Sequence, residues 1–139
     1  LEEILQQEIS DAPDNPELYS LLGDLKYSQN AFDEAAAAYE QSLTLAPDNA
    51  QVLNNLAWLY ATCEDQTVRR PERALMLALQ AAALDDSAHI LDTLAESYFV
   101  NGDIAAAIRY EQRALEKAGD NQDYYRQQLE RFHKALEGV

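Results

Sequence analysis

The chain has 139 residues, of which 47% are hydrophobic and 25% are charged. This length and composition suit one folded domain with a buried core and argue against intrinsic disorder. The formal net charge of −15 argues against nucleic-acid binding and against anionic membrane surfaces, both of which need clustered Lys and Arg. No run of about 18 apolar residues is present, so no membrane-spanning segment is expected.

The first ten residues predict a helix, because Leu1, Ile4, Leu5 and Ile9 recur at helical spacing and form one apolar stripe. The sequence begins inside this pattern and not at a Met. We therefore expect a fragment of a longer protein, in which this helix is the second of a pair whose first helix is missing. No targeting information follows from such a start, and the compartment, cytoplasmic or periplasmic, stays open.

Six further helices are expected in three pairs, and a final helix follows them. Asn15-Pro16 is a typical helix start, and Asn101-Gly102-Asp103 is typical of a tight turn. The final helix places Leu129, Phe132 and Leu136 on one side and charged residues around the other, which favours a capping helix. The expected helices span residues 16–29 and 32–45, 50–63 and 71–84, 88–100 and 104–117, and 121–137.

One pattern of large and small residues recurs three times along the chain. In each copy a large residue is followed three positions later by Leu and then by a small residue, which is Gly23, Ala57 or Ala95. The second helix of each copy carries two small residues seven positions apart. Small residues at fixed points let two antiparallel helices approach closely, and large residues fill the space to the next pair. The second-helix pairs are Ala35 with Ser42, Ala74 with Ala81, and Ala107 with Ala114.

This pattern resembles the tetratricopeptide repeat family over nearly the whole chain. The resemblance implies an all-α fold, a right-handed superhelix of antiparallel helix pairs, and a single solenoid domain. The stretch 53–71 is similar to bacterial repeats that have a long inner turn. The expected units are a truncated repeat at 1–14, repeats at 15–48, 49–86 and 87–120, and a cap at 121–139. The matching residues are Leu22, Gly23, Ala35, Tyr39 and Pro47; Leu53, Leu56, Ala57, Tyr60, Ala74 and Ala81; and Leu91, Leu94, Ala95, Tyr98, Ala107 and Ala114.

The second repeat departs from the pattern by about five extra residues between its helices. The added turn contains Arg69 and Arg70, with Arg73 close behind, and these form the one local cluster of positive charge. A surface insertion with solvated side chains explains the cluster, because loops tolerate added residues at little cost. A contact point for an acidic segment or for a neighbouring copy is the functional alternative.

The resemblance implies that the first helix of each repeat lines a concave groove that binds a protein or peptide. Helical spacing selects the inner positions, which lie off the buried stripe and have no identifiable packing role. Their aromatic and acidic side chains favour a partner with apolar and basic residues, because aromatic side chains dominate binding hot spots. The alternative is that Trp58 packs against the adjacent helix and that the acidic side chains only keep the surface hydrated. The predicted groove residues are Glu17, Ser20, Asp24, Tyr27, Gln51, Asn54, Trp58, Thr62, His89, Asp92, Glu96 and Phe99.

Some members of the family hold the C-terminal carboxylate of a peptide with several Lys, Arg and Asn side chains. The predicted inner face has Asn54 but no Lys or Arg, and Arg126 on the final helix is the nearest basic candidate. A carboxylate clamp is therefore not expected here.

No enzymatic activity, cofactor or metal is expected. His89 and His133 lie on different units without a His or Cys at metal-ligand spacing, and no glycine-rich phosphate loop is present. Cys63 stands beside Glu64 and Asp65, which is a poor setting for a nucleophilic thiolate, so a packing role is expected for it. A structural alternative to partner binding is homo-oligomerisation through the apolar stripe of the truncated N-terminal helix.

Overall fold

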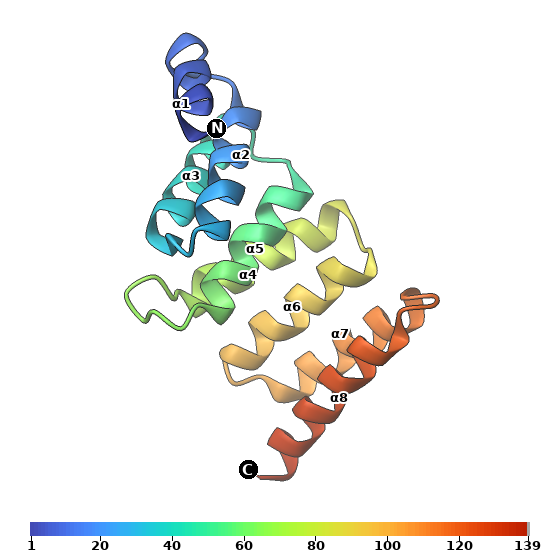
Figure 1. The fold of residues 1–139 in the computed structure, drawn as a ribbon. Coiled ribbons are helices and arrows are strands. Elements are labelled where there is room, and N and C mark those ends of the chain that lie inside the picture. The colour runs from blue at the N-terminus through green and yellow to red at the C-terminus, as the bar shows by residue number, and fades with distance from the viewer. Residues whose placement is uncertain (139) are drawn as a thin grey trace.

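The computed structural model describes residues 1–138, and within them the chain forms eight α-helices and no strand. The helices are stacked in chain order, and the N- and C-terminal ends lie at opposite ends of the stack (Figure 1). This arrangement confirms the expected all-α helical superhelix. The helices are α1 (Glu2–Asp11), α2 (Pro16–Ser28), α3 (Phe32–Leu45), α4 (Ala50–Thr62), α5 (Pro71–Leu84), α6 (Ala88–Val100), α7 (Ile104–Lys117) and α8 (Gln122–Glu137).

The helix bounds from α2 onward agree within one residue with those expected from the sequence. Three of the helix starts are held by side-chain caps. The Oδ1 atoms of Asn15, Asn49 and Asp103 accept hydrogen bonds from backbone amides in the first turns of α2, α4 and α7, at 3.1 Å each. Capping satisfies backbone donors that a helix start leaves unpaired, so these polar residues fix where the helices begin. Residue 139, the last of the expected cap, lies outside the described residues.

Small residues are buried where the paired helices cross, as the repeat pattern predicts. Ala35, Ala57, Ala74 and Ala107 are fully buried between the helices of their pairs. At Gly23 the reason is direct, because a Cβ atom there would lie 2.5 Å from Cε1 of Tyr39. Glycine at this position therefore lets the Tyr39 ring lie flat against α2.

The apolar core is continuous through the centre of the stack and divided towards the C-terminus. The largest cluster joins α3, α4, α5 and one side of α6, and it includes the buried Leu56, Leu59 and Leu77. Two smaller clusters lie between α6, α7 and α8, around Leu91 and Phe132. Of the expected apolar face of the last helix, Phe132 is fully buried, whereas Leu136 is 46% exposed. The apolar face of α8 is therefore covered around Phe132 and left open near its C-terminal end.

The extended turn between α4 and α5 projects from the side of the stack (Figure 1). It is anchored by the buried Cys63 and Val68 and by a hydrogen bond from the Arg70 amide to the Tyr60 carbonyl oxygen. The Arg69 guanidinium donates to the Ala61 carbonyl oxygen at 3.2 and 3.3 Å. These contacts give Arg69 a structural role at the end of α4. Among the described residues, no helix combines the length and apolar character needed to cross a bilayer.

Candidate functional site

A cavity of about 450 Å³ opens along the first helices of the three pairs. Its walls come from α2, α3, α4, α6 and α8, so side chains far apart in the sequence share one hollow. Four of them are aromatic and two are carboxylates, and none is Lys or Arg. The lining residues are Asp24, Tyr27, Tyr39, Asn54, Asn55, Trp58, His89, Asp92, Thr93 and Tyr124.

Half of the predicted groove residues line this cavity. One acidic and one aromatic residue come from α2, an amide and the single tryptophan come from α4, and an imidazole and a carboxylate come from α6. Trp58 is half-buried and faces the cavity. The residues that agree with the prediction are Asp24, Tyr27, Asn54, Trp58, His89 and Asp92.

Four other predicted residues lie outside the cavity lining. Gln51 is exposed beside it, and its Oε1 lies 3.1 Å from Nε2 of His89. The Ser20 hydroxyl donates to the Glu17 carbonyl oxygen at 2.9 Å, and the Thr62 hydroxyl donates to the Trp58 carbonyl oxygen at 2.7 Å. The hydroxyls of Ser20 and Thr62 are thus engaged with their own helices, and Glu17 is exposed at the start of α2.

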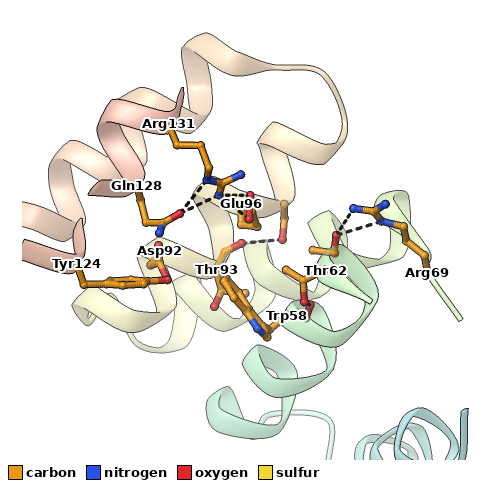
Figure 2. A network of polar contacts seen from close by, with 11 residues as sticks. Trp58, Thr62, Arg69, Asp92, Thr93, Glu96, Tyr124, Gln128 and Arg131 are labelled. Carbon is orange, nitrogen blue, oxygen red and sulfur yellow. Dashed lines mark hydrogen bonds and ion pairs between the residues drawn. The ribbon is translucent and has the colours of Figure 1, made fainter. Parts of the chain in front are cut away.

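Glu96 and Phe99 pack under α8, which corrects the expectation that the inner positions have no packing role. The Arg131 guanidinium binds both carboxylate oxygens of Glu96, at 2.6 and 2.9 Å. Phe99 stacks against Phe132 with ring centroids 4.8 Å apart. Figure 2 shows Arg131 reaching Glu96 from the last helix. The final helix covers this end of the groove. Glu96 and Phe99, which would be exposed in a repeat without this helix, therefore lie in the interface between α6 and α8.

Arg131, and not Arg126, is the basic residue that reaches the inner face of the third pair. Arg126 is exposed and contacts Asp123 and Gln122 on its own helix. Arg126 and Arg131 are five residues apart, which places them about 140° apart around the axis of α8. The sequence alone leaves the rotation of a terminal helix undefined. The packing of Phe132 sets that rotation here.

Tyr39 and Tyr124 are cavity residues that the groove prediction missed. Tyr39 belongs to a second helix, yet its ring passes over Gly23 and its hydroxyl donates to the Asp24 carboxylate. Tyr124 comes from α8, and its hydroxyl donates to Oδ2 of Asp92 at 2.8 Å (Figure 2). The spacing of Gly23 and Tyr39 was a usable signal, whereas the position of Tyr124 depends on tertiary packing. Asn55 and Thr93, also missed, neighbour predicted residues on α4 and α6.

A buried acidic cluster stands behind the cavity wall. Glu111 on α7 is fully buried, and burial together with its hydrogen bond to Asp92 raises the pKa of the Glu111 carboxyl to about 10. Burial also raises the pKa of Asp92, opposed by its hydrogen bonds with Glu111 and Tyr124. A proton on Glu111 lets this carboxyl donate a hydrogen bond to Asp92. Glu111 is therefore neutral at pH 7.

Asn54 contributes an unsatisfied acceptor at the wall of the cavity. Its side chain is 7% exposed, and its Oδ1 has no hydrogen-bond partner among the described residues. An unpaired buried carbonyl oxygen costs about 1–3 kcal/mol, so it is a place where a donor from outside would stabilise the site. Within residues 1–138, no group of three or more His, Cys, Asp or Glu side chains could hold a metal ion.

Comparison with known proteins agrees with the repeat architecture. A family model described as TPR repeat matches residues 23–62. The chain is 31% identical over 113 residues to the formate-dependent nitrite reductase complex subunit NrfG of Escherichia coli O157:H7. That match covers 81% of this chain and 56% of the relative, so the chain spans little more than half the length of the curated protein it matches.

Solved structures share the fold at low sequence identity. The first TPR of Spaghetti (RPAP3), bound to the HSP90 peptide SRMEEVD, superposes with a TM-score of 0.76 at 20% identity, covering 88% of this chain and 94% of that chain. The Sgt2 TPR domain from Aspergillus fumigatus gives a TM-score of 0.75 at 22% identity, covering 88% of this chain and 79% of that chain. The repeat match at residues 23–62, the curated relative and the fold shared with TPR domains all support the resemblance to the tetratricopeptide repeat family.

Proposed function

We propose that this chain is an interaction module that binds a peptide or an extended segment of a partner protein in the groove along α2, α4 and α6. The observation that carries the proposal is the cavity of about 450 Å³ with four aromatic walls and two carboxylates. Concave, largely apolar sites with a few polar groups are typical of ligand binding, and aromatic side chains bury large areas with few rotatable bonds. The role proposed is binding without catalysis.

The composition of the groove favours a basic and apolar partner over an acidic one. The related RPAP3 domain is bound to the HSP90 peptide SRMEEVD, which carries acidic residues before its C-terminus. In this chain the cavity presents Asp24 and Asp92 and no Lys or Arg. Like charges facing each other across an interface cost several kcal/mol, so an acidic peptide tail fits this groove poorly.

The curated relative is named as a subunit of a nitrite reductase complex. A repeat module inside a larger assembly needs a binding surface and no reaction centre of its own. We propose a comparable place for this chain, as the part of an assembly that holds a segment of another protein.

A displayed library of random twelve-residue peptides tests the proposal. We expect the wild-type chain to enrich a family of sequences, and we expect Trp58→Ala to weaken the best of them at least about tenfold, because a central aromatic anchor contributes roughly 2 kcal/mol or more. Tyr27→Ala is the second variant, since Tyr27 lies at the open edge of the cavity and its removal disturbs the fold less.

Met76→Ala is the matched control. Met76 is large, apolar and exposed, but it lies on α5 outside the cavity. If no peptide is enriched, or if Met76→Ala weakens binding as much as Trp58→Ala and Tyr27→Ala, the groove is not the binding surface and the proposal fails.

Self-association is a second candidate function, supported by an apolar surface at the N-terminal end. Leu1 is 89% exposed, Ile4 63% and Leu21 53%, and they line a hollow of about 370 Å³ between α1 and α2. Contiguous exposed apolar patches commonly mark interaction sites. Sedimentation over a concentration series tests this alternative. It predicts a dimer that Ile4→Glu and Leu21→Glu dissociate, whereas a monomer at all concentrations contradicts it.

A further inference from the structure

We infer that the cavity between α2, α4, α6 and α8 receives one cationic side chain, a lysine or an arginine, from the bound peptide. The inference rests on the proposed function and names the chemistry of one subsite within it. Three features of the cavity wall carry it, namely its uncompensated charge, its unsatisfied acceptor and its aromatic surfaces.

The first feature is negative charge without a compensating cation. Asp92 is 7% exposed, and Asp24 lies across the cavity from it on α2. Among residues 1–138, neither carboxylate forms an ion pair with Lys or Arg. A buried carboxylate is costly unless it is paired with a cation. The protein supplies no cation for Asp92, so a ligand cation that enters the cavity would form the missing ion pair.

The neighbouring acids Glu96 and Glu111 do not compete with Asp92 for a cation, because each is already neutralised. Glu96 is paired with Arg131 at 2.6 Å, and Glu111 holds a proton. Tyr124 donates a hydrogen bond to Asp92 but brings no charge. Of the acids in this cluster, Asp92 is the one that lines the cavity, and no Lys or Arg of the described residues forms an ion pair with it.

The second feature is the Oδ1 atom of Asn54, which is buried and has no partner in the described part of the chain. Asn54 lies on α4 in the wall of the same cavity. A rotation of its amide that brings this oxygen to the cavity surface would let an ammonium or guanidinium group donate to it. A purely apolar ligand would leave Asn54 unsatisfied and Asp92 without a cation, and an anionic ligand would be repelled.

The third feature is the ring surfaces of Tyr27, Tyr39, Trp58 and Tyr124 around the acceptors. Aromatic faces attract cations and also pack against the methylene stems of Lys and Arg. A hollow lined by two carboxylates and four aromatic rings therefore matches a long side chain with a charged end. A bare metal ion is a poor match, since no three suitable ligands converge within the described residues.

The experiment uses two small probes of equal shape, N-acetyl-arginine amide and its neutral counterpart N-acetyl-citrulline amide. Each is titrated onto the labelled chain while the indole N–H of Trp58, the single tryptophan, is followed by NMR. We expect millimolar binding of the arginine probe and at least about fivefold weaker binding of the citrulline probe. Asp92→Asn and Asp24→Asn should each reduce that ratio, whereas Asp48→Asn, an exposed acid outside the cavity, should leave it unchanged.

Equal shifts with both probes, or an undiminished arginine preference in both Asp92→Asn and Asp24→Asn, would overturn the inference. Because Asp92→Asn also alters the contacts with Tyr124 and Glu111, its fold is checked by near-ultraviolet circular dichroism, and Asp24→Asn provides the variant outside the buried cluster.

The peptide library separates this inference from the proposed function. Enriched peptides that bind through Trp58 but tolerate replacement of every Lys and Arg by norleucine or citrulline would leave the function standing and remove the cationic subsite. Enriched peptides that lose about tenfold or more on replacement at one position, in the wild type but not in Asp92→Asn, support the subsite.

Discussion

The centre and the C-terminal end of the stack are built from the same helical unit but stabilised in different ways. Between α3, α4 and α5 the interior is a continuous apolar cluster. Between α6, α7 and α8 the apolar clusters are small, and Asp92, Glu96, Ser97 and Glu111 are buried with them. Stability in the centre thus depends on packing, whereas stability at the C-terminal end also depends on charge pairing and on a retained proton.

This difference relates directly to function. Buried polar groups cost stability unless they are satisfied, so their position beside the cavity is informative. The centre supplies a frame that holds Trp58 and Asn54, and the C-terminal end supplies Asp92, the carboxylate that we propose selects the ligand. In a stacked repeat each layer contacts only its neighbours, so the two regions can respond separately to mutation.

The largest effect is expected from Leu56→Ala in the centre. Leu56 is fully buried in the main cluster, and such truncations cost about 2–5 kcal/mol in free energy of unfolding. Urea denaturation followed by far-ultraviolet circular dichroism measures the loss. Leu79→Ala is the control, because Leu79 is partly exposed on α5, and its cost should stay below about 1 kcal/mol. Equal losses would show that the centre is not the dominant core.

The pH dependence of stability tests the retained proton. The pKa of Glu111 is about 10 in the folded chain, where burial raises it, against 4.5 as its ordinary value. The folded state therefore holds a proton that the unfolded chain releases, so the free energy of unfolding falls as pH rises from about 4.5 towards 10. Between pH 5 and pH 8 we expect this decline to be on the order of 2–4 kcal/mol, and Glu111→Gln should remove most of it.

Glu116→Gln, an exposed acid on the same helix, provides the reference for the pH series. Thermal melts of wild type, Glu111→Gln and Glu116→Gln across this pH range measure the decline. We expect it in the wild type and in Glu116→Gln, and we expect most of it to be absent in Glu111→Gln. Parallel curves for all three proteins would mean that Glu111 titrates normally and that the acidic cluster is not buried as described.

A smaller effect is expected from Arg131→Met, which removes the partner of Glu96. The Glu96 side chain is 10% exposed and that of Arg131 is 43%, so the lost interaction is only partly screened by solvent. We expect a loss of about 1–3 kcal/mol, concentrated in α6 and α8. Hydrogen exchange should show faster opening of those helices with unchanged protection of α4. The double variant Arg131→Met with Glu96→Gln should recover part of the loss, since no unpaired charge then remains.

Helix caps provide the finest comparison between the two regions. Asn49 caps α4 in the centre, and Asp103 caps α7 at the C-terminal end. Asn49→Ala and Asp103→Ala should each cost about 1 kcal/mol. Hydrogen exchange should show reduced amide protection throughout the stack for Asn49→Ala. For Asp103→Ala the reduction should be confined to α7 and α8. If Asp103→Ala lowers the protection of α4 by the same amount, the stack unfolds as one unit and the regional comparison fails.

The sequence was sufficient to predict the helices, their pairing and the family. Small residues at Gly23, Ala57 and Ala95 recur because helix crossings exclude larger side chains, and that requirement is local and repeated. Capping residues likewise act within one turn. Six of the ten residues that line the cavity followed from helical spacing on the helices that the family resemblance names, because residues three and four apart share one face of a helix.

Only the tertiary structure decided which of those positions remain open. The docking of α8 covers Phe99 and Glu96, turns Arg131 inward and adds Tyr124 to the cavity. It also buries Glu111 next to Asp92, and this burial raises the pKa of both carboxyls. Desolvation depends on every group that packs around a side chain. No spacing rule along one helix can therefore predict it, and the charge of the candidate site follows from the packing of the last helix against α6 and α7.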